Sequence, residues 1–420
     1  MPPRFWVSAL PQGTLAVPHE KETTVPAQGY DLITIGGGIA ASALAKAMAE
    51  QGAKVLVIER EVKFKDRVRG EALVCWGCGE ARELGIYELL KKSCGHDVPF
   101  VQTGMGIRDL TSTTPQRLPL LSFRHPVMQE TLLGAAEQAG AEVRRGITVE
   151  KIETGKTPAV ITNGGNRERI AARLVVAADD RGSAARKWAG FAVQEQSNPF
   201  YMAGVLLTDV KAPADTIHFI FNPDLGMCAV LIPLGDCRFR AYFIYPKTVG
   251  YRLQGDPMLE LFTSESPKVY PPLAEYYAEA KNIGPLASFD VSDSWVEHPY
   301  RDGVVLVGDA AATTDPTYGQ GLSLSLRDAR TLRDELSKDS DWAAAANRYA
   351  DQRRGYFRTC HTVEAWLRML FQNYSREAAA LRAKAMPLIA EDPTRVPDHI
   401  NSGLDLPLNE QVRARMFGEC

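Results

Sequence analysis

Hydrophobic residues follow two alternating patterns near the start of the chain. Residues 31–35 (Asp-Leu-Ile-Thr-Ile) form an apolar run that is too short for a helix and stops at Gly36, which predicts a buried strand. From residue 39 to residue 51 the apolar positions recur at helical spacing, and Gly52 stands where a helix would end. Residues 54–59 form a second apolar run. A strand, a helix and a strand within about 30 residues predict a βαβ unit with a parallel sheet and a right-handed crossover.

The same patterns return further along the chain. A helix is predicted over residues 127–139, a strand begins at Glu142, and apolar runs at residues 174–178 and 304–307 predict further buried strands. Residues 200–245 mix aromatic and β-branched residues with polar ones, which is typical of an antiparallel sheet with one covered face. Residues 342–390 are rich in Ala, Leu and Arg and predict helices. The chain is therefore predicted to form a parallel α/β core that is interrupted by an antiparallel layer and followed by a helical segment.

The composition is that of an ordinary globular protein, with 45% hydrophobic and 24% charged residues among 420. A formal net charge of −3 gives no reason to expect nucleic acid or an anionic membrane surface as a partner. We find no uninterrupted apolar run of about 18 residues, so no membrane span is expected. Residues 1–28 are rich in proline and lack the pattern of a signal peptide, so we interpret them as an N-terminal tail. Seven scattered cysteines favour a reducing compartment, and a cytoplasmic location is expected.

The first strand–helix junction carries a glycine motif. Residues 36–41 (Gly-Gly-Gly-Ile-Ala-Ala) fit the pattern G-x-G-x-x-G/A. In this pattern Gly36 allows the tight turn, Gly38 lets the backbone approach a pyrophosphate, and Ala41 keeps the helix close to the sheet. Glu59 ends the next strand, where a carboxylate can accept both ribose hydroxyl hydrogens and disfavours a 2′-phosphate. The turn predicts bound FAD or NAD rather than NADP, and the alternative is a glycine-rich turn without a ligand.

Four further segments resemble those of the group A flavoprotein monooxygenases, the single-component aromatic hydroxylases with the para-hydroxybenzoate hydroxylase fold. They are residues 67–73 (Arg-Val-Arg-Gly-Glu-Ala-Leu), Arg124, residues 178–186 (Ala-Asp-Asp-Arg-Gly-Ser-Ala-Ala-Arg), and residues 308–311 (Gly-Asp-Ala-Ala) with 316–321 (Pro-Thr-Tyr-Gly-Gln-Gly). The likeness extends from about residue 30 to residue 336 in the family's order, and the last segment is the most specific. This resemblance favours FAD over NAD.

The resemblance implies the α/β fold class. We expect a Rossmann-like FAD-binding domain with a parallel sheet, interrupted by an antiparallel β substrate layer, and a C-terminal helical segment. The discontinuous FAD-binding domain would comprise residues 29–100, 123–190 and 286–337. The substrate domain would comprise residues 101–122 and 191–285, and the helical segment residues 338–420.

Together, the glycine turn and the resemblance identify candidate site residues. Asp309 follows a predicted strand and is expected to accept a hydrogen bond from a ribityl hydroxyl. Residues 319–321 are expected to expose a second helix N-terminus to the electron-rich pyrimidine side of the flavin. The candidates for cofactor binding are Gly36, Gly38, Ala41, Glu59, Arg60, Arg69, Arg124, Asp179, Gly308, Asp309, Gly319, Gly321 and Leu322. The candidates for the oxygen-reacting face of the flavin, through backbone roles, are Pro316, Gly319 and Gln320.

The resemblance implies an FAD-dependent monooxygenase that uses molecular oxygen, through a flavin C4a-hydroperoxide, to hydroxylate or epoxidise an electron-rich aromatic or polycyclic small molecule. The electron donor would be NAD(P)H or a partner flavin reductase. Three alternatives stay open: a flavin-dependent halogenase, an FAD-dependent reductase of isoprenoid double bonds, and a non-catalytic flavin-binding protein. Residues 69–73 also resemble the G-E-S-L segment of the halogenases. However, the chain has neither their W-x-W-x-I-P motif nor a lysine between His96 and Arg108.

Three positions depart from the family pattern. Asp180 stands where the family has a glycine, Ala312 where it has a histidine, and Ser323 where it has an asparagine. A second carboxylate at position 180 would repel a pyridine dinucleotide by about 1 kcal/mol at surface dielectric. We therefore hypothesise that the protein uses free NAD(P)H poorly or takes reduced flavin from a partner reductase.

Other candidate sites have weaker support. Residues 75–78 (Cys-Trp-Gly-Cys) form a C-x-x-C pair, but no second pair stands at zinc spacing, so two packed thiols are the better interpretation. The seven histidines are scattered without an H-E-x-x-H motif, and no metal site is expected. Six residues of the antiparallel layer could line an apolar substrate pocket, although alternation allows only half of them to face it. They are Ile217, Phe219, Phe221, Met227, Tyr242 and Ile244.

Overall fold

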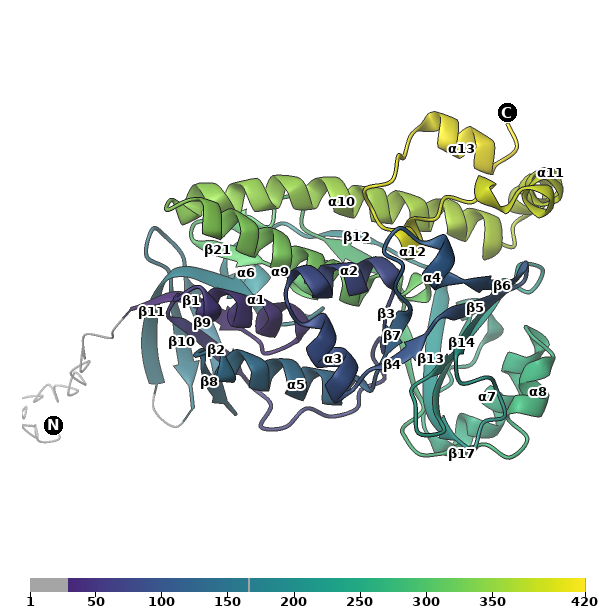
Figure 1. The fold of residues 1–420 in the computed structure, drawn as a ribbon, viewed down its shortest axis with the longest axis horizontal. Coiled ribbons are helices and arrows are strands. Elements are labelled where there is room, and N and C mark those ends of the chain that lie inside the picture. The colour runs from purple at the N-terminus through teal and green to yellow at the C-terminus, as the bar shows by residue number, and fades with distance from the viewer. Residues whose placement is uncertain (1–28, 165–166, 420) are drawn as a thin grey trace, which may run out of the picture.

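The computed structural model describes residues 29–164 and 167–419, and the predicted N-terminal tail lies outside them. Two sheets stand at opposite ends of the molecule, and long helices run along one side (Figure 1). This arrangement confirms the predicted α/β fold class with an antiparallel layer and C-terminal helices. No helix within the described residues is both long and apolar enough to cross a membrane.

The first sheet is built around the predicted βαβ unit. Its order is β20–β21–β11–β1–β2–β8, and the pairs from β21 to β8 are parallel. The strands are β1 (Tyr30–Ile35), β2 (Val55–Glu59), β8 (Glu142–Arg145), β11 (Arg167–Ala177), β20 (Tyr300–Arg301) and β21 (Val304–Leu306). The first half of β11 also pairs with β10 (Ala159–Asn163), which pairs with β9 (Thr148–Glu153). The predicted core strands are confirmed, and β21 brings residue 304 beside a strand that precedes it by more than a hundred residues.

Three helices pack together beside this sheet, and their apolar faces meet in one core. They are α1 (Ile39–Glu50), α5 (His125–Gln138) and α9 (Gly321–Lys338). Helix α1 is buried on most of its surface because it is rich in alanine and lies against both α5 and α9. Helix α5 begins two residues before the predicted start, with Pro126 in its first turn, where a missing N–H has no cost.

The second sheet is antiparallel apart from one parallel pair, β14 with β5. Its order is β17–β13–β16–β15–β14–β5–β6, and β18 also pairs with β13. The strands are β5 (Phe100–Thr103), β6 (Gly106–Asp109), β13 (Phe200–Thr208), β14 (Thr216–Asn222), β15 (Met227–Pro233), β16 (Arg238–Pro246), β17 (Lys281–Asn282) and β18 (Ala287–Asp290). One face packs on α7 (Leu259–Glu265) and α8 (Pro272–Tyr276), and the other faces the centre of the molecule (Figure 1). The sheet predicted over residues 200–245 is confirmed.

Short elements connect the two sheets. The strand pairs β3–β7–β4 and β12–β19–β22 form two small sheets between them. The short strands are β3 (Ala72–Leu73), β4 (His96–Val98), β7 (Leu120–Ser122), β12 (Gln194–Gln196), β19 (Asp293–Trp295) and β22 (Ala312–Thr313). The short helices are α2 (Cys75–Glu83), α3 (Tyr87–Ser93), α4 (Leu110–Thr113) and α6 (Ala184–Trp188).

The C-terminal segment is helical, as predicted, and it covers the junction between the two sheets. Helix α10 (Trp342–Phe371) runs alongside α9 and continues towards the antiparallel sheet (Figure 1). It is followed by α11 (Arg376–Glu391), α12 (His399–Ser402) and α13 (Glu410–Met416). Because α12 contacts α2, the chain returns from α11 to the centre of the molecule.

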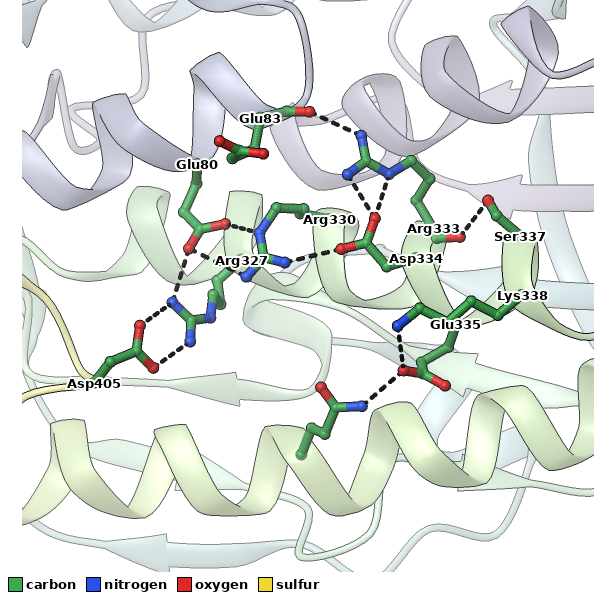
Figure 2. Close-up of polar contacts among 11 residues, drawn as sticks. Glu80, Glu83, Arg327, Arg330, Arg333, Asp334, Glu335, Ser337, Lys338 and Asp405 are labelled. Carbon is green, nitrogen blue, oxygen red and sulfur yellow. Dashed lines mark hydrogen bonds and ion pairs between the residues drawn. The ribbon is translucent and has the colours of Figure 1, made fainter.

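Ion pairs fix α9 to α2 and to the C-terminal segment, on the side away from the core. Figure 2 shows Glu80 of α2 between Arg327 and Arg330 of α9. Arg327 also donates two hydrogen bonds, of 2.9 and 2.5 Å, to the Asp405 carboxylate. Lower on α9, Glu335 accepts from Lys338 and from Gln352 of α10. We interpret this network as structural, because every member has a partner and none lines the large cavity between the two sheets.

Candidate functional site

A cavity of about 1690 Å³ lies between the two sheets. The β1–α1 turn and Glu59 line one end, and the inner face of the antiparallel sheet and the C-terminal segment line the other. Between these ends the wall is formed by residues 67–72, 178–182, 313–314, 316–319 and 321–322. The glycine turn and all of the segments that share the family resemblance except Arg124 therefore contribute to one continuous space.

The first glycine turn is shaped by its backbone. Gly36 has φ +99°, and a Cβ there would lie 2.5 Å from the carbonyl oxygen of Ala178. Gly38 has an ordinary extended backbone and borders the cavity, and nothing lies within 4 Å of where its Cβ would be. The buried Glu59 carboxylate accepts hydrogen bonds from the N–H groups of Gly37, at 2.7 Å, and Glu61, at 2.8 Å. The turn leaves backbone exposed beside open space, which suits a phosphate group.

The second glycine turn, formed by residues 308–321, lies beside the first. A Cβ on Gly308 would approach the Cβ of Ala40 at 3.5 Å, so the start of α1 and the end of β21 are direct neighbours. Gly308 has φ +58°, and its N–H donates to the buried Asp328 carboxylate at 2.8 Å. Gly319 has φ +67° with open space beside it, and Gly321 begins α9. The two turns, almost 300 residues apart in the chain, thus open onto the same cavity.

Three buried side chains of helix α10 stabilise the second turn through hydrogen bonds. The Tyr349 hydroxyl donates to the carbonyl of Leu306 at 2.9 Å. Arg353 and Tyr356 donate to Asp328 at 3.1 and 2.5 Å, and Asp328 in turn holds the N–H of Gly308. Because these side chains are buried, breaking one pair would leave an unpartnered charge or hydroxyl in the core.

Two charged groups face each other at the centre of the cavity wall. The Arg69 guanidinium donates two parallel hydrogen bonds, of 2.8 and 2.6 Å, to the Asp180 carboxylate. Burial opposes ionisation of Asp180, but the bonds from Arg69 prevail and hold its pKa below the usual value. Asp180 has φ +75°, which explains why the family has a glycine there and why aspartate is tolerated. Its charge is therefore already compensated, which weakens the predicted repulsion of a pyridine dinucleotide.

Asp309 lines the cavity close to this pair. Burial, together with the negative charge of Asp180, raises the pKa of Asp309 to about 6, although Arg69 opposes the shift. His125 borders the same region, and its Nδ1 lies 2.7 Å from the carbonyl oxygen of Gly70. Burial lowers the pKa of His125 to about 4, so the ring is neutral at pH 7 and donates to that carbonyl.

A buried arginine that the sequence did not reveal fixes the loop at residues 66–71. Arg240 of β16 is fully buried and donates to Glu71 at 2.7 and 3.0 Å and to Asp66 at 2.7 Å. The Tyr242 hydroxyl donates to the backbone carbonyl of Arg69 at 2.5 Å. The antiparallel sheet therefore positions the loop that carries Arg69.

The far end of the cavity is apolar and aromatic. Ile217, Phe219 and Phe221 alternate along β14 on one face and line it, with Tyr242 and Val230 from the neighbouring strands. Phe221 stacks on Phe371 of α10 with ring centroids 5.6 Å apart. Of the six residues considered from the sequence, Met227 and Ile244 do not line the cavity. The remaining four share one face, which is one more than the half that we expected, because Ile217, Phe219 and Phe221 stand at alternate positions of the same strand.

The C-terminal segment completes this end of the cavity, a contact that was not predicted from the sequence. Met386, Val396 and Ile400 line the cavity. Arg108 of β6 donates to both oxygens of Asp398, at 2.7 and 2.8 Å, and so ties the β5–β6 hairpin to the start of α12. Both charged groups also line the cavity, and each is about one-third exposed.

Most of the predicted site residues share this cavity. It is lined by Gly36, Gly38, Glu59, Arg60, Arg69, Asp179, Gly308, Asp309, Pro316, Gly319, Gly321 and Leu322. Ala41, Arg124 and Gln320 do not line it. Ala41 is buried within α1, and the Gln320 side chain is buried between Trp76 and the carbonyl of Tyr318. Arg124 precedes α5, and its buried Nε has no hydrogen-bond partner among the described residues.

The cysteine pair is inert in its surroundings. Cys75 and Cys78 are buried, unbonded thiols in α2, and burial raises the pKa of Cys75 to about 11 and that of Cys78 further. Thiols that ionise only at such high pH are poor nucleophiles and poor metal ligands. Among residues 29–164 and 167–419, no three His, Cys, Asp or Glu side chains are grouped so that they could hold a metal ion.

Comparisons with known proteins agree with this geometry. Residues 30–355 match the family model described as FAD binding domain. The chain is 26% identical over 387 residues to 6-methylpretetramide 4-monooxygenase of Streptomyces rimosus, covering 88% of this chain and 91% of the relative. It is 26% identical over 329 residues to conditioned medium factor receptor 1 of Dictyostelium discoideum, covering 72% of this chain but only 62% of that relative.

Solved structures share the fold. A p-nitrophenol 4-monooxygenase from Pseudomonas putida superimposes with a TM-score of 0.75 at 19% identity, covering 89% of this chain and 96% of the other. The flavin-dependent brominase Bmp2 superimposes with a TM-score of 0.72 at 17% identity, covering 88% of this chain and 93% of the other.

Proposed function

The chain belongs to the family of FAD-binding domains found in flavin-dependent monooxygenases, and on this premise we propose that it hydroxylates or epoxidises an electron-rich, largely apolar aromatic molecule. The observation that carries the proposal is the continuity of the cavity. The apolar chamber formed by Phe219, Phe221 and Phe371 opens directly onto the Pro316–Gly321 turn. A substrate held in that chamber would face the flavin, if the flavin binds at that turn.

The described residues fit FAD. Space is open beside Gly38 and beside Gly319, where backbone N–H groups could approach a pyrophosphate and a flavin ring. Asp179 lines the cavity, and its buried Oδ1, which has no partner in the described part of the chain, is available to a polar ligand. We assign the adenosine diphosphate half to Gly36, Gly38 and Glu59, and the remainder to the surroundings of Asp309 and Gly319. Reduced flavin bound there would supply the chemistry that activates molecular oxygen.

The protein's own contribution is to position the substrate and exclude water. Aromatic walls hold an apolar molecule by burial of its surface, and the Arg108–Asp398 pair spans the opening between the β5–β6 hairpin and α12. Beside Asp309, the Arg69 guanidinium pairs with the Asp180 carboxylate. The electron donor that we propose is NAD(P)H or a partner flavin reductase.

Product analysis with isotopic oxygen tests the proposal. Protein loaded with FAD and chemically reduced is mixed with ¹⁸O₂ and a panel of phenols and polycyclic aromatic compounds, and the products are analysed by mass spectrometry. We expect one ¹⁸O atom per product molecule. Release of peroxide alone with every compound, or transfer of hydrogen without oxygen, would contradict monooxygenation.

Halogenation is the second candidate, because residues 69–73 resemble the corresponding segment of flavin-dependent halogenases and the brominase shares the fold. Repeating the reaction with bromide or chloride separates the two. A brominated or chlorinated product would favour the halogenase, whereas an oxygenated product that is independent of halide favours the monooxygenase.

A further inference from the structure

Three carboxylates lie buried behind the second glycine turn, and the mechanism above does not use them. Asp293 is 1% exposed, and Asp315 and Glu364 are fully buried. Asp315 immediately precedes the turn at Pro316–Tyr318, and Glu364 lies on the inner face of α10. Buried carboxylates are rare unless they are paired, so a group of three requires an explanation.

One arginine serves two of the three. Arg368 Nη2 lies 3.1 Å from Asp315 Oδ2 and 3.4 Å from Asp293 Oδ2, so both carboxylates share one nitrogen. His361 Nε2 lies 3.4 Å from the same Asp293 oxygen. No cation lies within 4.0 Å of Glu364 in the described part of the chain. The groups that face this cluster from the surrounding elements are Asp293, Asp315, Tyr318, Cys228, Cys360, His361 and Arg368.

Burial and the neighbouring carboxylates, rather than its hydrogen bonds, favour the neutral form of Glu364. Its Oε2 accepts from the backbone N–H of Asp315 at 3.4 Å, and its Oε1 lies 3.5 Å from Cys360 Sγ. If Glu364 were ionised, a fully buried negative charge would stand beside two aspartates with only Arg368 to balance them. Burial and these two aspartates accordingly raise its pKa well above the usual value.

The cluster controls the turn that borders the cavity. Asp315 Oδ1 accepts from the N–H of Thr317 at 3.0 Å and so fixes the first residues of the turn. Arg368 holds the other oxygen of Asp315, and Gln372, the C-cap residue of α10, accepts from the Tyr318 hydroxyl at 3.0 Å. Glu364, Arg368 and Gln372 recur every four residues, so a single stripe of α10 holds both ends of the turn.

We propose that Glu364 and Arg368 are positioning residues for the flavin, because they fix Asp315 and, through it, the Pro316–Gly319 turn. Glu364 fills this role only while it carries a proton. Loss of that proton places repelling charges beside Asp315 and loosens the turn. This inference rests on the placement of FAD proposed above. It predicts that FAD affinity falls as the pH rises, because Glu364, which does not line the cavity, loses its proton.

The test compares Glu364→Gln, which keeps the shape but cannot ionise, with the wild type and with a control on the same helix. Arg354→Gln is the control, because Arg354 is exposed and, among residues 29–164 and 167–419, pairs only with the exposed Asp351. The dissociation constant for FAD is measured by quenching of flavin fluorescence between about pH 5 and pH 9. In parallel, the unfolding of each apoprotein is followed over the same range.

We expect E364Q and the wild type to bind FAD equally at the acid end. At the alkaline end E364Q should bind about tenfold more tightly, which corresponds to one pKa unit of linkage. E364Q apoprotein should also gain stability relative to the wild type as the pH rises, and R354Q should follow the wild type throughout. Arg368→Met should weaken FAD binding at every pH, and E364Q carries the test if that variant does not fold.

Parallel FAD-binding curves for E364Q and the wild type would overturn the positioning role, even if the apoprotein curves diverge. Parallel curves in both measurements would show that Glu364 holds no relevant proton. A wild-type protein that binds no FAD at any pH would instead contradict the proposed function. In that case the pH dependence of apoprotein unfolding would still report on the buried acids, so the two failures can be told apart.

Discussion

Replacement of Gly36 and Gly38 by alanine is predicted to affect different properties: Gly36→Ala the stability of the fold, and Gly38→Ala the binding of FAD. In Gly36→Ala, the residue must keep φ +99°, which costs about 1–2 kcal/mol. Its methyl group would lie 2.5 Å from the Ala178 carbonyl oxygen, and relief of that contact costs about 1–3 kcal/mol more. We therefore expect the apoprotein to lose about 2–5 kcal/mol of unfolding free energy. The fold should be weakened before any ligand is present.

Gly38→Ala meets neither obstacle. Gly38 has φ −72°, and no atom lies within 4 Å of the added methyl group. Alanine restricts the unfolded chain but is a poorer N-cap than glycine, so the unfolding free energy should change by less than about 1 kcal/mol. The methyl group enters the space that we assign to the pyrophosphate. Loss of one charge-assisted hydrogen bond, about 1.5–3 kcal/mol, would weaken FAD binding by roughly 10- to 150-fold.

Urea unfolding of the apoproteins and fluorescence titration with FAD measure both quantities. We expect G36A to be unstable, and G38A to be stable but deficient in FAD binding. If G38A bound FAD as tightly as the wild type, the pyrophosphate would not lie at this turn. If G36A were as stable as the wild type, the steric argument from the Ala178 carbonyl would be wrong.

Three further predictions concern charged groups. Arg240→Met should cost about 3–5 kcal/mol in urea unfolding because it leaves Glu71 buried without its partner, and a loss below 1 kcal/mol would refute this. The pKa of Asp309 is raised to about 6, so Asp309 in the folded protein keeps a proton that it loses in the unfolded chain. The stability of the apoprotein should therefore fall as the pH rises from about 4 to 6. Asp309→Asn should flatten that fall by up to about 3 kcal/mol in the same assay, and an unchanged pH profile would contradict the assignment. Because Arg69 already compensates the charge of Asp180, Asp180→Asn should change the rate at which NADH or NADPH reduces bound FAD by less than about fivefold in stopped-flow experiments. A larger increase in that rate would instead support repulsion of the pyridine dinucleotide by Asp180.

Local patterns were sufficient to predict the parallel core and the first glycine turn, whereas the second turn was predicted from the family resemblance. Apolar runs of strand length, interrupted by Gly36 and Gly308, require buried strands that end in turns with positive φ, and the structure has both. The order of the segments then indicated that residues near 308 return to the first strand, and β21 does so through β11. The family resemblance added the ligand, which no pattern of apolar residues could have specified.

Contacts between distant segments could not be predicted in the same way. Arg240 looks like one polar residue in an alternating strand, and nothing near it in sequence marks Glu71 as its partner. The apolar wall contributed by Val396 and Ile400 depends on how the chain returns after α11. The polar stripe of α10 did leave a signal, because polar residues repeated every four positions in a helix indicate one polar face. The sequence did not say whether that face was solvated or buried.

The central claim is that one FAD molecule spans the cavity from the first glycine turn to the second. A crystal structure of the protein with FAD tests it directly. We predict continuous density for one FAD per chain, with the pyrophosphate at Gly38 and the flavin ring against residues 319–321. Density for FAD elsewhere, or a cavity that stays empty at saturating FAD, would contradict the account.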